Sequence, residues 1–154
     1  MELILQSLDN ILDLNNSFKE VVLLSLYVSV LATIISSIIS IYLSSYMAIE
    51  NFSGKNTITL IFNSLMSLPP VVVGLILYII FSSSGVLGFT DLLYSPQIMI
   101  IAQFIIITPI IISLSLKSLN DRYNLLDDYL FSLNASKNKI RRTIIYESRY
   151  DLLI

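Results

Sequence analysis

Side chains that could carry out acid–base or metal chemistry are scarce in this sequence. Its 154 residues include no Cys and no His, which removes thiol nucleophiles, zinc sites of the Cys/His type and the commonest general base. The long uncharged runs hold no paired carboxylates that could take over these roles. We therefore expect no catalytic residue, no metal ligand and no cofactor, and a membrane enzyme is the least favoured function.

One arrangement that could matter for function is a Pro-Pro pair within an uncharged run. Pro69 and Pro70 interrupt an uncharged run from Thr57 to Thr90. They break the helical hydrogen-bond ladder and push Leu68 toward an extended conformation. Inside a membrane, such a break is tolerated only where protein or water replaces the lost backbone bonds. The pair therefore indicates a position that faces other protein or a water-filled space.

A second arrangement is the charged stretch at residues 127–140. Its two acidic residues are predicted to open a helix, where the helix dipole favours them, and an apolar patch follows. Asn134 is suited to end that helix in a left-handed conformation, and the basic residues from Lys137 begin another helix. The pattern predicts a helix-turn-helix that offers an apolar patch to a cytosolic partner. The alternative is a charged juxtamembrane loop that only sets topology.

The elements that position these residues must be membrane helices. Of all residues, 55% are hydrophobic and 13% are charged, whereas a soluble domain carries about 25% charged residues. The excess apolar surface must face lipid. A formal net charge of -2 gives no support for binding to nucleic acid.

Three membrane spans are predicted, at about residues 21–46, 57–81 and 97–116. The first lies in an uncharged run from Val21 to Ile49, which exceeds the roughly 20 residues needed to cross the hydrocarbon. The second contains the Pro-Pro break and ends near Phe81, before a Ser/Gly-rich turn. The third follows Pro96 and is kinked by Pro109. The predicted class is an all-α membrane protein, with its transmembrane domain at residues 18–119.

The two flanks of this domain differ in charge. Residues 1–17 predict an amphipathic helix at the membrane interface, with a partly ordered tail as the alternative. From Lys117 onward the chain holds seven of its nine Lys and Arg residues, which marks the segment at 120–154 as cytoplasmic. Counting back through three spans places the Gly54 loop inside, and the Asp91 loop and the N-terminus outside.

The C-terminal pattern resembles the cytoplasmic coupling loop of binding-protein-dependent ABC importer permeases. In that family the pattern is Glu-Ala-Ala, three residues, Gly, nine residues and Ile-x-Leu-Pro. Asn in place of Gly still permits a left-handed backbone, whereas Tyr in place of the first Ala adds bulk to the docking surface. The resemblance implies that these residues couple the chain to an ATPase: Asp128, Tyr129, Leu130, Asn134, Ala135, Ser136, Ile144 and Glu147.

A second region is similar to the molybdate and tungstate branch of these permeases, and most similar to the tungstate type. The similar residues are Asn63 to Leu75, Ser84 to Gly88, Ala102 to Phe104, Thr108 to Ile110 and Glu147 to Arg149. The resemblance implies a partial type I ABC importer permease fold in the bacterial cytoplasmic membrane, with the permease forming a homodimer in the lipid bilayer. It also implies two partners, a cytoplasmic ABC ATPase subunit and an extracytoplasmic protein that delivers tungstate or molybdate. The stretch Gly54-Lys55-Asn56-Thr57 lacks the upstream Gly and the preceding strand of a phosphate loop, so ATP must be bound by the partner.

For the passage of such an oxyanion, the predicted spans offer neutral donors and no fixed Arg or Lys. Backbone N–H groups freed by the Pro-Pro break add further donors. For any single Ser, the alternative is a hydrogen bond back to its own helix. The candidate path residues are Asn63, Ser64, Ser67, Pro69, Pro70, Gly74, Gln103 and Pro109.

Other interpretations stay open. Sulfate, phosphate or amino acids are alternative solutes, and a membrane anchor or scaffold that moves no solute is an alternative function. Permeases of this family are longer, with further membrane helices after the coupling loop. We therefore expect this chain to be C-terminally truncated, a fragment or a part that a second chain completes, and an inactive truncated permease is the corresponding alternative.

Overall fold

The chain folds into helices joined by short connections. A computed structural model describes residues 16–132 and 136–152, and no strand occurs among them. This confirms the predicted all-α class, while the helix predicted at residues 1–17 lies almost wholly outside the described residues. The elements are α2 (Asn16–Ile49), α3 (Lys55–Leu65), α4 (Pro70–Phe81), the 3-10 turn η1 (Gly88–Thr90), α5 (Pro96–Ser132) and α6 (Lys137–Glu147).

Two helices dominate the architecture. Within the described part of the chain, α2 and α5 are each long and apolar enough to cross a membrane. The 37 residues of α5 extend about 55 Å, against about 30 Å of hydrocarbon. Apolar side chains along α2 are largely exposed, with 62% for Val21, 65% for Leu23 and 66% for Ile38. Such a surface suits lipid and not water, as the composition predicts.

The contact between α2 and α5 is built on small side chains. Every fourth residue of α2 in the contact region is buried, in the order Val28, Ala32, Ser36, Ser40, Ser44 and Ala48. The hydroxyls of Ser40 and Ser44 reach across to α5, each 3.3 Å from a backbone carbonyl oxygen, that of Thr108 and that of Ile112 respectively. Because lipid is as apolar as a Leu side chain, helices in membranes associate through close packing and such hydrogen bonds.

The predicted second span is divided at the Pro-Pro pair. Pro69 adopts an extended conformation as the N-cap of α4, with φ −63° and ψ 133°, and Pro70 is the first residue of that helix. The axes of α3 and α4 meet at 95°, so the pair is a broken span or a re-entrant loop and not one straight helix. The sequence predicted the break but not the right angle.

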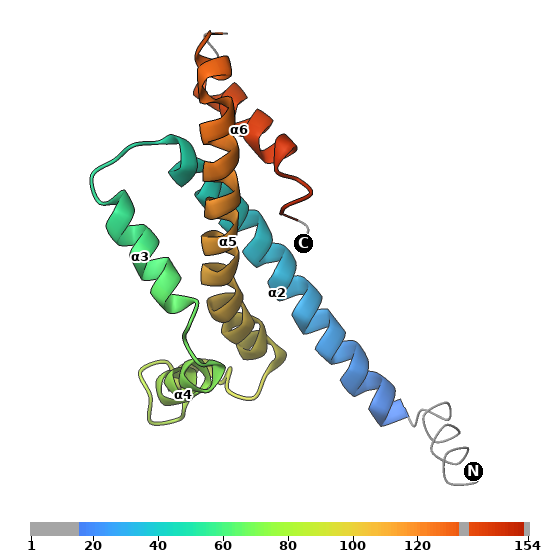
Figure 1. Cartoon of the computed structure of the whole chain (residues 1–154). Helices are drawn as coiled ribbons and strands as arrows, with labels where there is room; N and C mark the ends of the chain where they lie inside the picture. Colours follow the sequence, from blue (N-terminus) through green and yellow to red (C-terminus); the bar gives the residue numbers. More distant parts are fainter. Residues whose placement is uncertain (1–15, 133–135, 153–154) are drawn as a thin grey trace, which may run out of the picture.

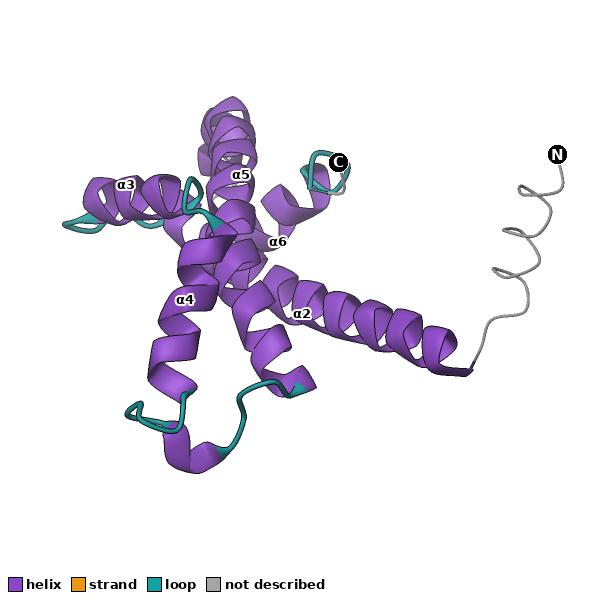
Figure 2. Cartoon of the chain, turned by 90° about the horizontal axis from the view of Figure 1, so that it is seen from below, coloured by secondary structure: helices purple, strands orange, loops and turns teal. Residues whose placement is uncertain are grey.

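The molecule has two opposite ends, one at α6 and the other at α4 (Figure 1). At the α6 end, α2 finishes, α3 begins and α5 finishes; here Met47, Leu119 and Ile144 belong to one buried cluster. At the opposite α4 end, Val73 and Leu77 pack against Ile98 at the start of α5. Seen from below, α2, α3 and α4 point away from α5 in different directions (Figure 2).

The structure corrects one prediction about α5. No helix opens at Asp127, because α5 continues without interruption to Ser132. The reason is local: no Gly or Pro occurs after Pro109 in this helix, so nothing separates the predicted third span from the predicted coupling segment. The two acidic residues therefore lie near the C-terminal end of a helix, where the dipole disfavours them.

Candidate functional site

The segment with coupling-loop resemblance forms an arm at the α6 end. We use "arm" for residues 117–132 of α5 together with α6. Inside the arm, Ile144 is 1% exposed and joins the cluster made by the ends of α2 and α5. An ion pair of 2.6 Å links Lys137 Nζ to Glu50 Oε2 just after α2. The arm is therefore fixed to the membrane helices by both apolar and charged contacts.

The predicted coupling residues differ in their exposure. Tyr129 and Glu147 are exposed, whereas Leu130 and Ile144 are buried, with Leu130 only 6% exposed. Ser136 is the N-cap of α6 and makes no side-chain capping bond. Three of the remaining predictions concern parts that are not described: Asn134 and Ala135 lie outside the described residues, as does the side chain of Asp128. Their coupling role stays a prediction.

The predicted path residues do not line one common cavity. Asn63 lines a groove between α3 and α5, Gly74 lines a hollow of about 430 Å³ between α4 and α5, and Pro109 lines an apolar cavity of about 210 Å³. Ser67 is exposed beside the break that Pro69 and Pro70 create. A single path through these residues therefore stays a prediction.

Two of the predicted path residues already have protein partners. Ser64 Oγ donates a hydrogen bond of 2.9 Å to the carbonyl oxygen of Leu60, so this side chain bonds back to its own helix, which is the alternative to a role in the path. Gln103 Nε2 donates to Ser29 Oγ on α2 at 3.5 Å. Its Oε1 is buried without a partner among the described residues. Gln103 therefore contributes to the α2–α5 contact.

Sequence reasoning missed most of the polar groove around Asn63. This groove has a volume of about 380 Å³. Ser113 Oγ, in the groove wall, is buried without a hydrogen-bond partner in the described chain. The signal in the sequence is helical spacing, because polar residues recur at i and i+4 on α3 and at i, i+4 and i+7 on α5. The groove is lined by Thr59, Asn63, Met66, Ser113, Leu114, Leu116, Lys117, Asn120 and Asp121.

The groove can hold an anion only weakly. Lys117 is its one cation among the described lining residues, and the carboxylate of Asp121 opposes it. The hydroxyl proton of Thr59 is already donated to the carbonyl oxygen of Lys55. The amides of Asn63 and Asn120 remain as neutral donors.

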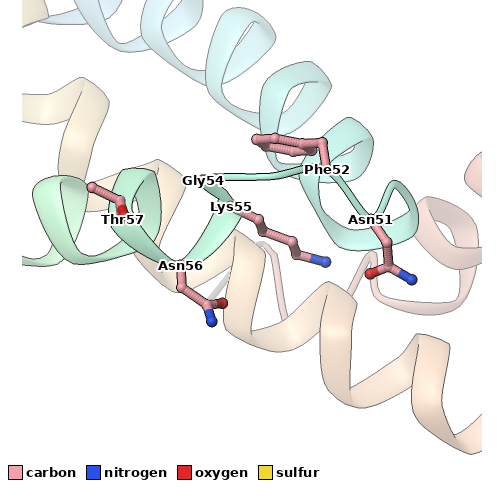
Figure 3. Close-up of a pocket in the computed structure, with 6 residues that line it drawn as sticks. All are labelled: Asn51, Phe52, Gly54, Lys55, Asn56 and Thr57. Carbon is pink, nitrogen blue, oxygen red and sulfur yellow. The ribbon is translucent and has the colours of Figure 1, made fainter.

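The Gly54 loop encloses a further hollow, of about 460 Å³ (Figure 3). Gly54 has φ 96°, a left-handed conformation that permits the tight turn into α3. Lys55 extends toward Asn51 in Figure 3, and its Nζ donates to the carbonyl oxygen of Ala48 at 3.3 Å. Lys55 thus caps the C-terminal end of α2. Because the ammonium of Lys55 already binds this backbone oxygen, the loop gives no indication of a nucleotide site.

Similar proteins are known for most of the chain. The sequence is 32% identical over 142 residues to a probable anion ABC transporter permease protein of Haloferax volcanii, covering 92% of this chain and 61% of that protein. It is 35% identical over 134 residues to the tungstate uptake system permease protein TupB of Peptoclostridium acidaminophilum, covering 87% and 59%. The same-named protein of Campylobacter jejuni is 39% identical over 105 residues, covering 66% and 43%.

The coverage sets the scope of these similarities. The chain spans about three fifths of the length of the first two relatives, at 61% and 59%. No protein-family model and no solved structure matches it. The predicted resemblance to ABC permeases of the tungstate type is confirmed by these relatives.

Proposed function

We propose that this chain, a homologue of anion ABC transporter permeases, forms membrane-spanning structure of an ATP-driven importer for an oxyanion. Tungstate is the first candidate for the substrate and molybdate the second. The observation that carries the proposal is the 35% identity over 134 residues to a tungstate uptake permease. The exposed apolar surface of α2 and the length of α5 support the membrane location.

The arm is the proposed docking site for a cytoplasmic ATPase subunit. Tyr129 on α5 and Glu147 on α6 are exposed there, and α5 connects Tyr129 to the membrane part without a break. ATP binding falls to the partner. This orientation puts the α6 end in the cytoplasm, as the concentration of Lys and Arg favours, and the N-terminus outside.

The α4 end is the proposed contact for an extracytoplasmic binding protein. Three large apolar side chains project from its loop, with exposures of 86% for Val86, 81% for Phe89 and 85% for Tyr94. The backbone packs closely in this loop, since a Cβ at Gly85 would clash with the carbonyl oxygen of Ile79. A fixed loop with exposed apolar residues suits a protein partner.

The polar groove beside Lys117 is the proposed stretch of the passage nearest the cytoplasm. A weak site is appropriate there, because an anion bound too tightly would not be released. The open sides of α3 and α5 at this groove are the surfaces at which a second copy of the permease would close the passage, in the homodimer that we propose.

Uptake measurements test the proposal. Cells that lack their own tungstate uptake but contain the cognate ATPase and binding protein are given a permease with this sequence, and intracellular tungsten is measured by mass spectrometry. We expect accumulation that depends on the permease, with competition by molybdate stronger than by sulfate or phosphate. Competition by sulfate or phosphate alone would favour another oxyanion. ATPase binding without accumulation of any oxyanion would favour a scaffold.

A further inference from the structure

The corner between α2 and α6 holds an arginine on an aromatic surface. The guanidinium carbon of Arg141, on α6, lies 5.7 Å from the ring centre of Tyr42 and 5.6 Å from that of Tyr46, both on α2. Such distances allow cation–π attraction to both rings. We call Arg141, Tyr42 and Tyr46 the Arg–Tyr site.

Among the described residues, Arg141 has no hydrogen-bond or ion-pair partner. Its Nε is buried without a hydrogen-bond partner in the described chain. The ion pairs among the described residues join Arg122 to Asp151 and Lys137 to Glu50, so no described carboxylate neutralises Arg141. Arg149 shows the contrast: it also lies over two tyrosine rings, but its Nη1 donates to a backbone carbonyl oxygen at 3.0 Å.

The Arg–Tyr site lies at the edge of the apolar part of α2. Tyr42 and Tyr46 occupy the last turns of α2, which ends at Ile49, and Glu50 is the first charged residue after them. Tyrosine is enriched at this depth in membrane proteins, where one side of the ring is apolar and the other wet. Phosphate groups of the lipid headgroups occupy the same depth, so an anion from outside the described chain can supply the partner of this guanidinium.

The face of α2 that precedes the Arg–Tyr site in the sequence is apolar and exposed. Ile38, Tyr42 and Tyr46 follow one another at intervals of four residues, so they form one stripe on the helix. Their exposures are 66%, 64% and 43%. The stripe therefore presents an aliphatic surface, then aromatic rings, then a cation that can form paired hydrogen bonds with phosphate.

We propose that the Arg–Tyr site binds the phosphate group of an anionic membrane phospholipid, with an acyl chain lying along the stripe of Ile38, Tyr42 and Tyr46. The shared chemistry is that of a tetrahedral oxyanion, which inorganic phosphate or tungstate also offers. The exposed aliphatic surface next to the cation favours the lipid, since a soluble anion gains nothing from Ile38. Lys139 and Arg142 are exposed on the same helix and raise the attraction for anionic headgroups.

Native mass spectrometry of the purified chain in detergent tests the proposal. Phosphatidylglycerol and phosphatidylcholine with equal acyl chains are titrated against the wild-type chain and three variants: Arg141→Gln, Arg141→Lys and Arg142→Gln. The last is the matched control, because it removes the same charge from an exposed neighbour that has no tyrosine contact. Circular dichroism verifies that each variant retains its helix content.

We expect the wild-type chain to prefer phosphatidylglycerol. Arg141→Gln should weaken its binding by about ten-fold, and Arg142→Gln by less than about two-fold, since only Arg141 makes charge-assisted bonds to the phosphate. Arg141→Lys should lie between them, because lysine keeps the charge without the planar fork. Equal losses in Arg141→Gln and Arg142→Gln would reduce the site to diffuse attraction and overturn the proposal. Displacement of the lipid by millimolar phosphate or tungstate would overturn it in favour of a soluble anion.

Discussion

Lys137 and Glu50 join the start of α6 to the end of α2 through an ion pair of 2.6 Å, and each stands where its own helix disfavours it. A carboxylate just after a helix C-terminus and an ammonium at a helix N-terminus both oppose the helix dipole. The pair therefore offsets two unfavourable placements, and its net effect is to fix where α6 lies against α2.

A charge swap tests this relationship. Glu50→Lys combined with Lys137→Glu keeps the ion pair and places both charges where the dipoles favour them. We expect the double variant to be more stable than the wild type by about 0.5–1 kcal/mol, measured by denaturant unfolding in detergent. Each single variant leaves two like charges together and should speed hydrogen exchange in α6. A double variant no more stable than the wild type would contradict the dipole argument, and one no more stable than the single variants would contradict the ion pair.

The small-residue contact between α2 and α5 predicts a size limit. Ser40 is fully buried against α5, so Ser40→Leu should push the helices apart and cost about 1–3 kcal/mol or more. Ser40→Ala removes only a hydrogen bond and should cost about 0.5–1 kcal/mol. Ser25→Leu, at an exposed position of the same helix, is the control. Unfolding in mixed micelles measures all three, and similar costs for the two Leu variants would show that α2 is not packed as described.

The right angle between α3 and α4 should depend on the proline pair. Replacing Pro69 and Pro70 together by Ala restores helix propensity and two N–H donors, so the bend of 95° should open. The chain has no Cys, so spin labels on Leu60→Cys and Leu75→Cys, both exposed, report the distance directly. It should lengthen in the Ala variant and stay constant in Pro109→Ala.

Docking of the ATPase should depend on the exposed face of the arm. Tyr129 is 63% exposed, so Tyr129→Asp should reduce capture of the ATPase by about ten-fold or more without unfolding the helix. Leu130→Asp is a poorer probe, because it places a charge at a buried position. Tyr94→Asp, an exposed tyrosine at the opposite end, should leave capture unchanged. Equal capture by Tyr129→Asp and the wild type would remove this face from the docking site.

Anion passage through the polar groove should depend on its cation. Lys117→Met should lower tungstate uptake by about five-fold or more, because no other described lining residue is positive. Lys117→Arg should retain most uptake. Lys139→Met, which removes a charge from the exposed side of α6, is the control. If Lys117→Met and the wild type took up tungstate equally, the groove would be no part of the passage.

Residues that act locally made much of the fold predictable from the sequence. Pro96 begins α5, Gly54 forms the left-handed turn before α3, and α4 ends at Phe81 as predicted. Each of these features depends on the φ range or hydrogen-bonding capacity of one residue. Such properties are visible without knowledge of the tertiary contacts.

The features that the sequence did not predict depend on how helices meet. The direction that α4 takes after Pro69 brings Val73 and Leu77 against Ile98 of α5, a contact that no local rule supplies. The groove could not be assembled before α3 was known to lie beside the second half of α5. The continuity of α5 is a different case: two acidic residues, at 127 and 128, are typical of a helix start, but nothing in the sequence before them ends a helix.

The unbroken course of α5 gives the molecule a mechanical property. A rod of about 55 Å that tilts by about 10° around one end moves its other end by about 10 Å. Tyr129 and the loop that carries Tyr94 lie at opposite ends of this one helix, and Pro109 in its interior, which has no N–H to donate to the preceding turn, is the point at which the helix can bend. We therefore expect a displacement at one end to reach the other to the extent that the helix does not bend at Pro109.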